Sequence, residues 1–456
     1  MTHRFPIAPA TLALALVAAT PAAAQTPPRE PTGAADELDQ RPRGVERRLE
    51  LADEAAAEKA KTAAAVVAGA DGFALRSADG AFQLRLRGLL QTDGRWFFGD
   101  DERPLADTLV VRRARPILEG TLWKIVDFRL MPDFGSGGST LQDGYLDLRF
   151  SPAVRLRAGK AKVPVGLEAL LEDANLPFVE RGLPSALAPV RDVGVQIHGE
   201  PAGGRLSYAA GLFNGSVDGG SGDGDNADDK DVAARILVRP FQRPASEPSA
   251  PVGLAFGIGA SLGDQIGSTS APTLPAFRTA GNQTFFSYLT DGTAAGTTLA
   301  DGERLRLAPQ LYLHSGPWYL LAEWTESRQE IRRDATRAEL THRAWQLVGS
   351  WAVTGEPVTE RGFAPRRPWE RGGGRGGLLI SVRYGELELD TDTFPTFADP
   401  SRTASSAANL GVSLGWALHR SVKLVLDGEQ TTFEGGAAGG DRETERVLLA
   451  RAQLTF

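Results

Sequence analysis

The sequence predicts an all-β fold: a transmembrane antiparallel β-barrel of about 16 strands, with a third loop folded inward and a short N-terminal helical segment. Three observations lead to this class. From Phe82 onward, apolar and polar residues alternate with the period of two that places successive side chains on opposite faces of a strand. The runs mostly reach the roughly 9–11 residues that a strand needs to cross a bilayer obliquely. Short connections mostly alternate with long loops, as they do at the two faces of an outer-membrane barrel.

The alternation continues to the end of the sequence. In residues 444–456 one face carries Leu448, Ala450, Ala452, Leu454 and Phe456, and the other is mainly polar. Because an unpaired backbone amide in lipid costs several kcal/mol, we expect this run to close the barrel by pairing with the first strand. Phe456 is then expected at the periplasmic rim. A soluble β-sandwich would alternate as well, but its strands average about 5–6 residues.

Residues 1–24 have the pattern of a secretory signal peptide. Arg4 precedes an apolar run, and small residues lead to a cleavage position after Ala24. The apolar run is shorter than the roughly 18 residues that a spanning helix needs. We therefore expect an exported protein of the Gram-negative outer membrane. The 456 residues include no cysteine, which excludes disulfides and Cys-ligated metals.

Residues 25–72 are expected to form a periplasmic linker, and residues 73–456 the barrel. The linker begins with a Pro-rich, charged stretch that cannot build a core. Residues 44–67 are rich in Ala, Glu, Lys and Arg, with Val45, Leu49, Ala52 and Ala56 at helical spacing, which predicts a short helix. A solvated helix and a short coiled coil both fit, because the apolar stripe is thin.

Arginine supplies most of the positive charge. The 50 basic residues include only seven lysines, and the net charge of −7 argues against nucleic acid as a partner. Rows of arginine on a pore wall can pass an anion from one weak site to the next. The alternation places these arginines on the inward face: Arg85, Arg87, Arg95, Arg113, Arg115, Arg129, Arg149, Arg155 and Arg157. It also places six acidic residues on that face: Asp93, Glu119, Asp127, Asp133, Asp147 and Asp427. The sequence therefore fits two alternatives, an anion pathway and a lining whose charges neutralise one another in ion pairs.

Residues 163–194 are long, partly apolar and not alternating. An ordinary surface loop would have less reason to carry Leu170, Leu176 and Phe178, so we expect this segment to fold into the lumen and form the constriction. Its polar residues are candidates for the pore lining: Glu168, Glu172, Asp173, Asn175, Glu180, Arg181, Arg191 and Asp192.

Several segments resemble those of the phosphate-selective porin O and P family. They include "RLRGLLQTDGRWFFGD", "VRRARPILEGTL", "FVERGLPSALAPVRDVGVQIHG", "YAAGLFNGSVDG" and "SWAVTGE", and the resemblance extends from about Phe82 to Phe456. It implies a 16-stranded, homotrimeric porin that passes small anions passively, phosphate or polyphosphate among them, without a cofactor. The family's selective lysine cluster has no recognisable counterpart among the few lysines of this chain. A non-selective general porin on the same barrel is the alternative.

The same reading predicts the partners of the chain. We expect outer-membrane lipid and lipopolysaccharide around the barrel. A C-terminal phenylalanine on such a strand resembles the signal that the outer-membrane assembly machinery recognises. The acidic residues 218–231 are expected in an external loop, either solvated or holding a divalent cation.

Signals for an enzyme are weak. The pattern "GVSLG" around Ser413 resembles a nucleophile motif, but it lies inside an alternating run and not at a strand-to-helix turn. The histidines are scattered, so we predict no catalytic residues and no metal site. An outer-membrane hydrolase is the alternative from a different functional class.

Overall fold

The computed structural model describes residues 47, 51–54, 64–69, 72–99, 105–224, 228–242 and 252–456. The chain divides into two compact units, residues 1–62 and residues 63–456. In the first unit, residue 47 and residues 51–54 are helical, within the predicted helix. The predicted signal peptide and the rest of the linker before residue 64 lie outside the described residues. The predicted helix is wrong at its end, because the β-branched pair Val66 and Val67 lies in strand β1 (Ala65–Gly69).

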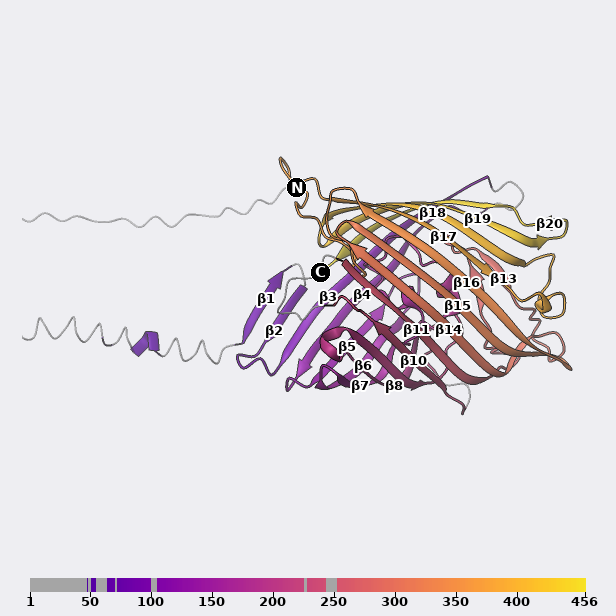
Figure 1. The fold of residues 1–456 in the computed structure, drawn as a ribbon, viewed down its shortest axis with the longest axis horizontal. Helices are drawn as coiled ribbons and strands as arrows, with labels where there is room; N and C mark the ends of the chain where they lie inside the picture. The colour runs from indigo at the N-terminus through magenta and orange to yellow at the C-terminus, as the bar shows by residue number, and fades with distance from the viewer. Residues whose placement is uncertain are drawn as a thin grey trace, which may run out of the picture. The chain divides into compact units, whose positions relative to one another are not determined.

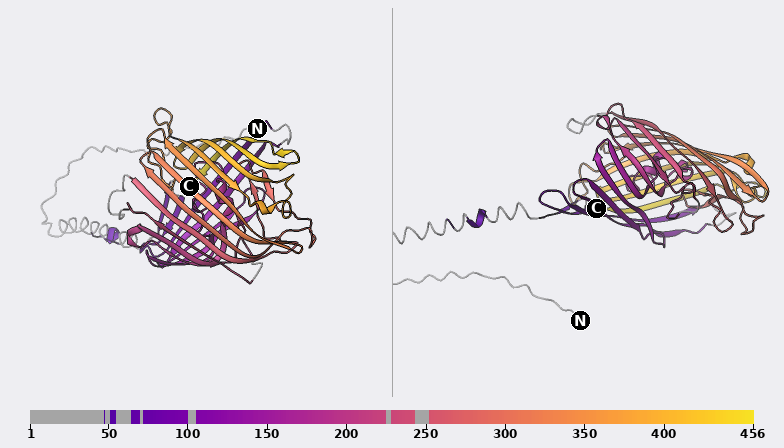
Figure 2. Two further views of the ribbon diagram at one scale, coloured as in Figure 1. Left: turned by 45° about the vertical axis from the view of Figure 1, so that its right-hand side comes forward. Right: turned by 90° about the horizontal axis from the view of Figure 1, so that it is seen from below.

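The second unit contains the predicted barrel. Sixteen of the 19 strands in the main sheet of the described residues close on themselves, each antiparallel to its neighbours (Figure 1). Figure 2 shows the yellow last strands beside the indigo first ones. The barrel strands are β3 (Gln83–Phe98), β4 (Thr108–Leu122), β5 (Val126–Asp133), β6 (Thr140–Ser151), β7 (Val154–Lys162), β8 (Arg191–Gly199), β9 (Leu206–Phe213), β10 (Asp231–Val238), β11 (Val252–Ile266), β14 (Leu299–Ser315), β15 (Trp318–Arg333), β16 (Thr336–Ala352), β17 (Gly377–Glu388), β18 (Ala404–His419), β19 (Val422–Ala437) and β21 (Glu445–Thr455).

The remaining elements are short. The described helices after residue 63 are α2 (Leu167–Leu170), η1 (Leu183–Leu187), η2 (Ala202–Gly204) and η3 (Thr391–Thr393). Within the described part of the chain, no helix has the length and apolar character to cross a membrane. Strand β20 (Gly440–Asp441) pairs with the end of β19, and β12 (Ala276–Arg278) pairs with β13 (Thr284–Ser287) in a separate sheet.

The barrel closes as predicted. Strand β21 pairs with β3, residues 446–455 against residues 98–89. Phe456 continues the pairing, because its N–H donates to the Gly88 carbonyl at 3.2 Å and its carbonyl accepts from the Gly88 N–H at 2.9 Å. Beyond this point β2 (Gly72–Arg76) pairs with residues 83–86 of β3, and β1 pairs with β2. The sheet therefore includes β1, whose residues we expected in the linker, and β2, which begins at the expected linker boundary.

Strand length divides the barrel into two sectors. Strands β14, β15, β16, β18 and β19 have 16 or 17 residues, whereas β5, β9 and β10 have eight and β7 and β8 have nine. The connections also vary. Residues 334–335 alone join β15 to β16, whereas turn T6 (residues 353–376) joins β16 to β17. T6 lies at the end of the barrel that carries Phe456 and is the orange loop at that end in Figure 1.

The interior of the long sector is packed, which differs from the expected wet lumen. Inward-facing Leu340, Leu387 and Phe433 pack against Phe277 and Phe286 of loop L5 (residues 267–298). A second cluster joins wall residues to loop L3 (residues 163–190) and T6 through Phe178 and Val358. Alternation identifies the inward residues but not the loops that cover them. The loops fill this side of the barrel, and the main cavity lies in the short sector.

Candidate functional site

Loop L3 crosses the lumen, as predicted. Its start is held by Glu323 of β15, which accepts from the backbone N–H of Leu167 and, at 3.2 Å, from that of Glu168. Its middle is held by β18 and β19, where Ser413 Oγ donates to the Pro177 carbonyl at 2.8 Å and Lys423 Nζ to the Ala174 carbonyl at 2.9 Å. The loop is therefore fixed to the wall of the long sector by hydrogen bonds to its own backbone.

Glu180 of L3 contacts arginines from four strands. Its carboxylate accepts from Arg112 Nε at 2.6 Å and lies 3.4 Å from Arg95 Nη2, 3.7 Å from Arg113 Nη2 and 3.9 Å from Arg451 Nη2. Its carbonyl accepts from Arg383 at 2.9 Å. This single carboxylate thus compensates much of the positive charge on β3, β4 and β21.

Asp173 of L3 forms ion pairs with three arginines. It is ion-paired with Arg115, with Arg181 at 2.5 Å and with Arg113 at 3.3 Å. Arg115 also donates to Asp133 at 2.6 Å. The side chains of Arg113 and Arg115 are buried. These predicted pathway arginines therefore hold the loop and do not line open space.

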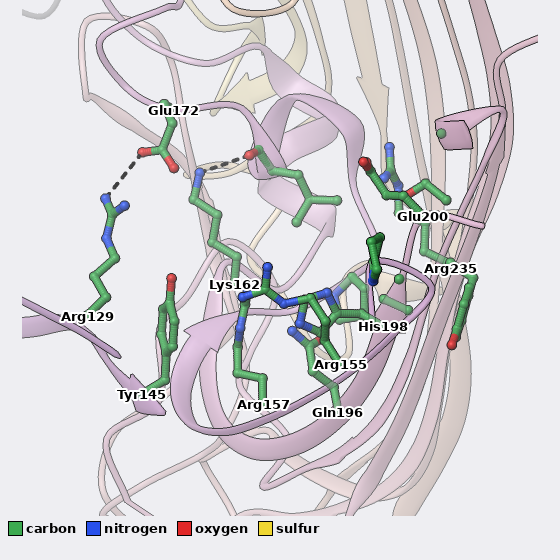
Figure 3. A pocket seen from close by; sticks show the side chains of 18 of the residues that line it. Arg129, Tyr145, Arg155, Arg157, Lys162, Glu172, Gln196, His198, Glu200 and Arg235 are labelled. Carbon is green, nitrogen blue, oxygen red and sulfur yellow. Dashed lines mark hydrogen bonds and ion pairs between the residues drawn. The ribbon is translucent and has the colours of Figure 1, made fainter. Parts of the chain in front are cut away.

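An open cavity of about 880 Å³ lies between L3 and the wall from β5 to β10 (Figure 3). Figure 3 shows Arg129 and Lys162 extending toward the part of L3 that carries Glu172, with Arg155 and Arg157 below Lys162 on the same strand, β7. The charged residues that line it, among those the structure describes, are five cations and three acids: Arg129, Arg155, Arg157, Lys162, Arg235, Asp143, Glu172 and Glu200. His198, Gln196 and Tyr145 add polar groups.

The cavity arginines are only partly engaged. Asp147, which is buried, accepts from Arg155 Nε at 3.0 Å and from Arg157 Nη2 at 2.7 Å, and lies 3.0 Å from His198 Nε2. The side chains of Arg155 and Arg157 remain 26% and 23% exposed. Arg157 also stacks over the Tyr145 ring at 4.3 Å. Asp147 thus positions both guanidinium groups, and Arg155 Nη2 is also paired with Asp127 at 2.5 Å, so that only part of each group faces the cavity.

Arg129, Lys162 and Arg235 complete the positive lining. Arg129 pairs with Asp143 at 3.0 Å and, more loosely, with Glu172 at 3.8 Å. Lys162 Nζ donates to the carbonyls of Leu170 and Leu171, at 3.0 and 2.6 Å. Arg235 donates to Gln310 Oε1 at 2.7 and 2.9 Å and forms no ion pair with a described residue.

The sequence reading missed three of these cations for different reasons. Arg112 sits at a register shift between β3 and β4, so that it and Arg113 both face inward. Gly159, at a φ of 121°, reverses the alternation in β7 and brings Lys162 inward. Neither irregularity has a sequence signal beyond the glycine itself. Arg235, in contrast, follows the alternation of β10, which does indicate that it faces inward.

Other predicted residues lie outside the cavity. Arg87 pairs with Glu119 at 3.4 Å, Arg149 pairs with Asp127 at 2.6 Å, and Arg85 is exposed on β3 opposite Glu119. Asn175 lines a separate, smaller cavity. Glu168 is buried, and it accepts from the Gly182 N–H at 2.7 Å and so braces L3 internally.

Arg191 and Asp192 were placed in the loop, but they begin strand β8. Arg191 pairs with Asp143 at 2.8 Å, and Asp192 accepts from the backbone N–H groups of Gly215 and Ser216 at 2.6 and 2.8 Å. The loop ends earlier than predicted because residues 191–199 pair with both β7 and β9.

The acidic segment 218–231 is not simply a solvated loop. Asp218 pairs with Arg306 at 2.5 Å, and Asp231 pairs with Arg304 and Arg306 at 3.1 and 3.0 Å, all buried in the barrel. Asp223 is ion-paired with Lys160. Within the described residues, no group of three or more His, Asp or Glu side chains is arranged to hold a metal ion.

The sequence profile of the phosphate-selective porin O and P family matches residues 82–456. The chain belongs to this family. As a porin of this family it is a diffusion channel of the outer membrane with anion preference. Ser413, the residue of the nucleophile-like motif, faces the lumen and binds L3.

The barrel is also similar to solved porin structures. The outer membrane channel DcaP of Acinetobacter baumannii has a TM-score of 0.52 at 11% identity, covering 86% of this chain and all of that one. An anion-selective porin from Comamonas acidovorans has a TM-score of 0.50 at 12% identity, covering 82% of this chain and all of that one. At such identities these likenesses show the fold. No curated protein sequence matches this porin.

Proposed function

We propose that anions cross this porin through the cavity between L3 and strands β5 to β10. The observation that carries the proposal is the lining of that cavity, in which five cations face three acids. On β3 and β4, by contrast, the carboxylates of L3 already occupy Arg95, Arg112, Arg113 and Arg115. An anion entering the cavity meets the outer edges of Arg155 and Arg157, with the carboxylate of Asp147 buried behind them.

The sites are suited to transit and not to tight capture. Conduction requires binding that is strong enough to admit an ion and weak enough to release it. Arg129 of β5 and Lys162, Arg155 and Arg157 of β7 lie along one wall of the cavity, each already holding a carboxylate or carbonyl oxygen. A passing anion exchanges with these partners in turn. Of the other predicted arginines, Arg85 is exposed outside the cavity and the rest become structural: Arg87, Arg95, Arg113, Arg115 and Arg149. Arg129, Arg155 and Arg157 remain the pathway.

The substrate class we propose is a small oxyanion such as phosphate. The planar guanidinium donates two parallel hydrogen bonds to a phosphate or carboxylate edge, and paired Arg155 and Arg157 offer two such groups to one ion. The family profile and the anion-selective neighbour support this class. The second candidate is a general porin, which the pairing of most lumenal arginines with carboxylates favours.

The assembly we propose is a homotrimer in the outer membrane. Strands β5, β9 and β10 have eight residues each, fewer than the roughly 9–11 that cross a bilayer. Contact with neighbouring copies would shield this short sector from lipid. We also propose export by a signal peptide in residues 1–24, recognition of Phe456 by the outer-membrane assembly machinery, and contact of the external loops with lipopolysaccharide.

Planar-bilayer recording tests the conduction proposal. In a KCl gradient the reversal potential should have the sign of chloride selectivity, and phosphate added on one side should reduce the chloride current at millimolar concentration. Sulfate and acetate serve as matched oxyanions of different charge. A cation-selective reversal potential would contradict the anion pathway. Equal reduction of the current by all three oxyanions would favour the general porin.

A further inference from the structure

An apolar groove lies on the outer surface of the long sector, next to T6. Its volume is about 360 Å³, and it is lined by side chains of β14 to β17. Two cross-strand rows form it: Leu320, Gly349 and Val382 in one, and Trp318, Trp351 and Ile380 in the other. Trp318 and Trp351 stack at 5.3 Å, and both are exposed.

Gly349 makes this groove. A Cβ placed on it would meet no atom within 4 Å, so the residue lies at the floor of open space. Large side chains occupy the neighbouring outward positions on both sides. A gap of this kind on the lipid-facing surface has the width and the apolar character for an acyl chain.

The second half of T6 forms a positively charged hairpin beside this groove. Gly376 N–H donates to the Arg367 carbonyl at 3.0 Å, and Glu370 N–H to the Gly374 carbonyl at 3.2 Å, which closes the hairpin. It carries exposed arginines and one glutamate: Arg366, Arg367, Arg371, Arg375 and Glu370. None of these arginines forms an ion pair with a described residue. The hairpin therefore presents uncompensated positive charge.

Contacts with β18 hold this hairpin at the rim of the barrel wall. Trp369 N–H donates to the Leu418 carbonyl at 2.7 Å, and Trp416 Nε1, on the outward face of β18, donates to the Arg375 carbonyl at 2.9 Å. The Trp369 side chain is 52% exposed. Tryptophan is enriched at the membrane–water interface. T6 shares its end of the barrel with the two-residue turns 316–317 and 420–421, and short turns of outer-membrane barrels lie on the periplasmic side. The hairpin is thus placed at the level of the inner-leaflet headgroups.

The groove and the arginines lie within the depth of one leaflet. Strand β17 begins at Gly377, two residues after Arg375, and the three steps from Gly377 to Ile380 are about 10 Å of strand. Half of the hydrocarbon core is about 15 Å thick. A phospholipid whose phosphate meets the arginines therefore brings its acyl chain past the stacked tryptophans to Gly349.

The geometry points to a binding site for an anionic phospholipid of the inner leaflet, formed by the Gly349 groove and the arginines of T6. Guanidinium groups bind phosphate oxygens through paired hydrogen bonds. A headgroup with net negative charge complements the excess of arginine, whereas a zwitterionic headgroup adds its own positive charge beside it. The site thus distinguishes lipids by headgroup and holds them by the chain.

Native mass spectrometry of the purified full-length porin tests this site. The porin is transferred from detergent into mixed micelles with equal amounts of phosphatidylglycerol and phosphatidylcholine of the same acyl length, and the bound lipids are counted. Wild-type protein should retain phosphatidylglycerol preferentially. The variant R366Q/R367Q/R371Q/R375Q should lose this preference, with retention falling about tenfold or more, since each arginine near a lipid surface changes affinity about fivefold.

Two further variants distinguish the contribution of the groove to lipid binding from that of the arginines. Gly349→Leu places a side chain in the groove, from a Cβ position that has no atom within 4 Å, and should lower phosphatidylglycerol retention about fivefold or more, since each buried methylene changes affinity about fourfold. The control R278Q/R337Q/R402Q removes exposed arginines at the opposite end of the barrel, two from loops and one from the start of β16, and should behave as wild type. Heat-modifiable migration on gels confirms that each variant is folded. Equal retention of both lipids by the wild type, or unchanged retention in either test variant, would overturn the proposal.

Discussion

Arg451 of β21 and Asp93 of β3 form a bidentate ion pair across the seam where the barrel closes, with both N–O distances at 2.7 Å. Both side chains are buried, and Arg451 also lies 3.9 Å from Glu180 of L3. The closing strand and the constriction loop therefore share one charged group.

Breaking this pair should destabilise the barrel. Arg451→Gln leaves Asp93 buried without its partner, which typically costs about 3–5 kcal/mol. The denaturant midpoint of unfolding in micelles measures the loss. Glu339→Gln, which removes an exposed pair with Arg328 at 3.6 Å, should cost less than about 1 kcal/mol. If the two variants unfold at the same denaturant concentration, the seam pair has no special role in stability.

Removing the cavity arginines should reduce anion preference. In Arg155→Gln/Arg157→Gln the buried Asp147 loses both guanidinium partners, so negative charge replaces positive charge at the cavity wall. We expect the chloride-to-potassium permeability ratio to fall about fivefold or more, which reversal potentials in a KCl gradient measure.

The matched control for this experiment is Arg85→Gln. Arg85 has the inward parity that the sequence indicates, but it lies outside the cavity. The chloride-to-potassium permeability ratio of the Arg85→Gln variant should stay within about twofold of wild type, because solvent and salt screen an exposed charge. The opposite ranking of the two variants would place the pathway along β3 and not along β5 to β10.

Glu180→Gln should loosen L3 and free arginines for the permeating anion. The carboxylate compensates Arg112 directly and lies within 4 Å of three other arginines. We expect larger and more variable single-channel conductance together with stronger anion selectivity. Glu200→Gln, at the cavity edge and largely exposed, provides the control for removal of one acid. Unchanged conductance in Glu180→Gln would show that this carboxylate does not set the constriction.

Gly88→Ala should impair barrel closure. A Cβ on Gly88 would lie 2.6 Å from the Phe456 ring, so the ring must move from its place at the seam. Such overpacking costs about 1–3 kcal/mol. The folded fraction on unheated gels measures the effect. Gly428→Ala on β19 meets no atom within 4 Å and should fold as wild type, so equal loss in both variants would indicate a general cost of replacing a strand glycine.

Several features of this porin follow from the sequence alone. Alternation from Phe82 onward determines strands, faces and closure, because side chains in a strand can point only two ways and lipid tolerates no unpaired edge. The same pattern places Arg129, Arg155 and Arg157 inward correctly. The non-alternating, partly apolar residues after 163 likewise indicate a loop with something to pack against, and L3 does pack inside.

Only the tertiary structure decided which inward-facing arginines can bind a passing anion. Arg113 and Arg155 look alike in the sequence, but Asp173 and Glu180 reach the first and leave the outer edge of the second open. Such pairings depend on the path of L3 and on local shifts at Arg112 and Gly159, where a bulge or a positive φ reverses the alternation. Alternation is a property of neighbours along one strand, whereas charge compensation joins residues far apart in the chain, and only the folded barrel brings those together.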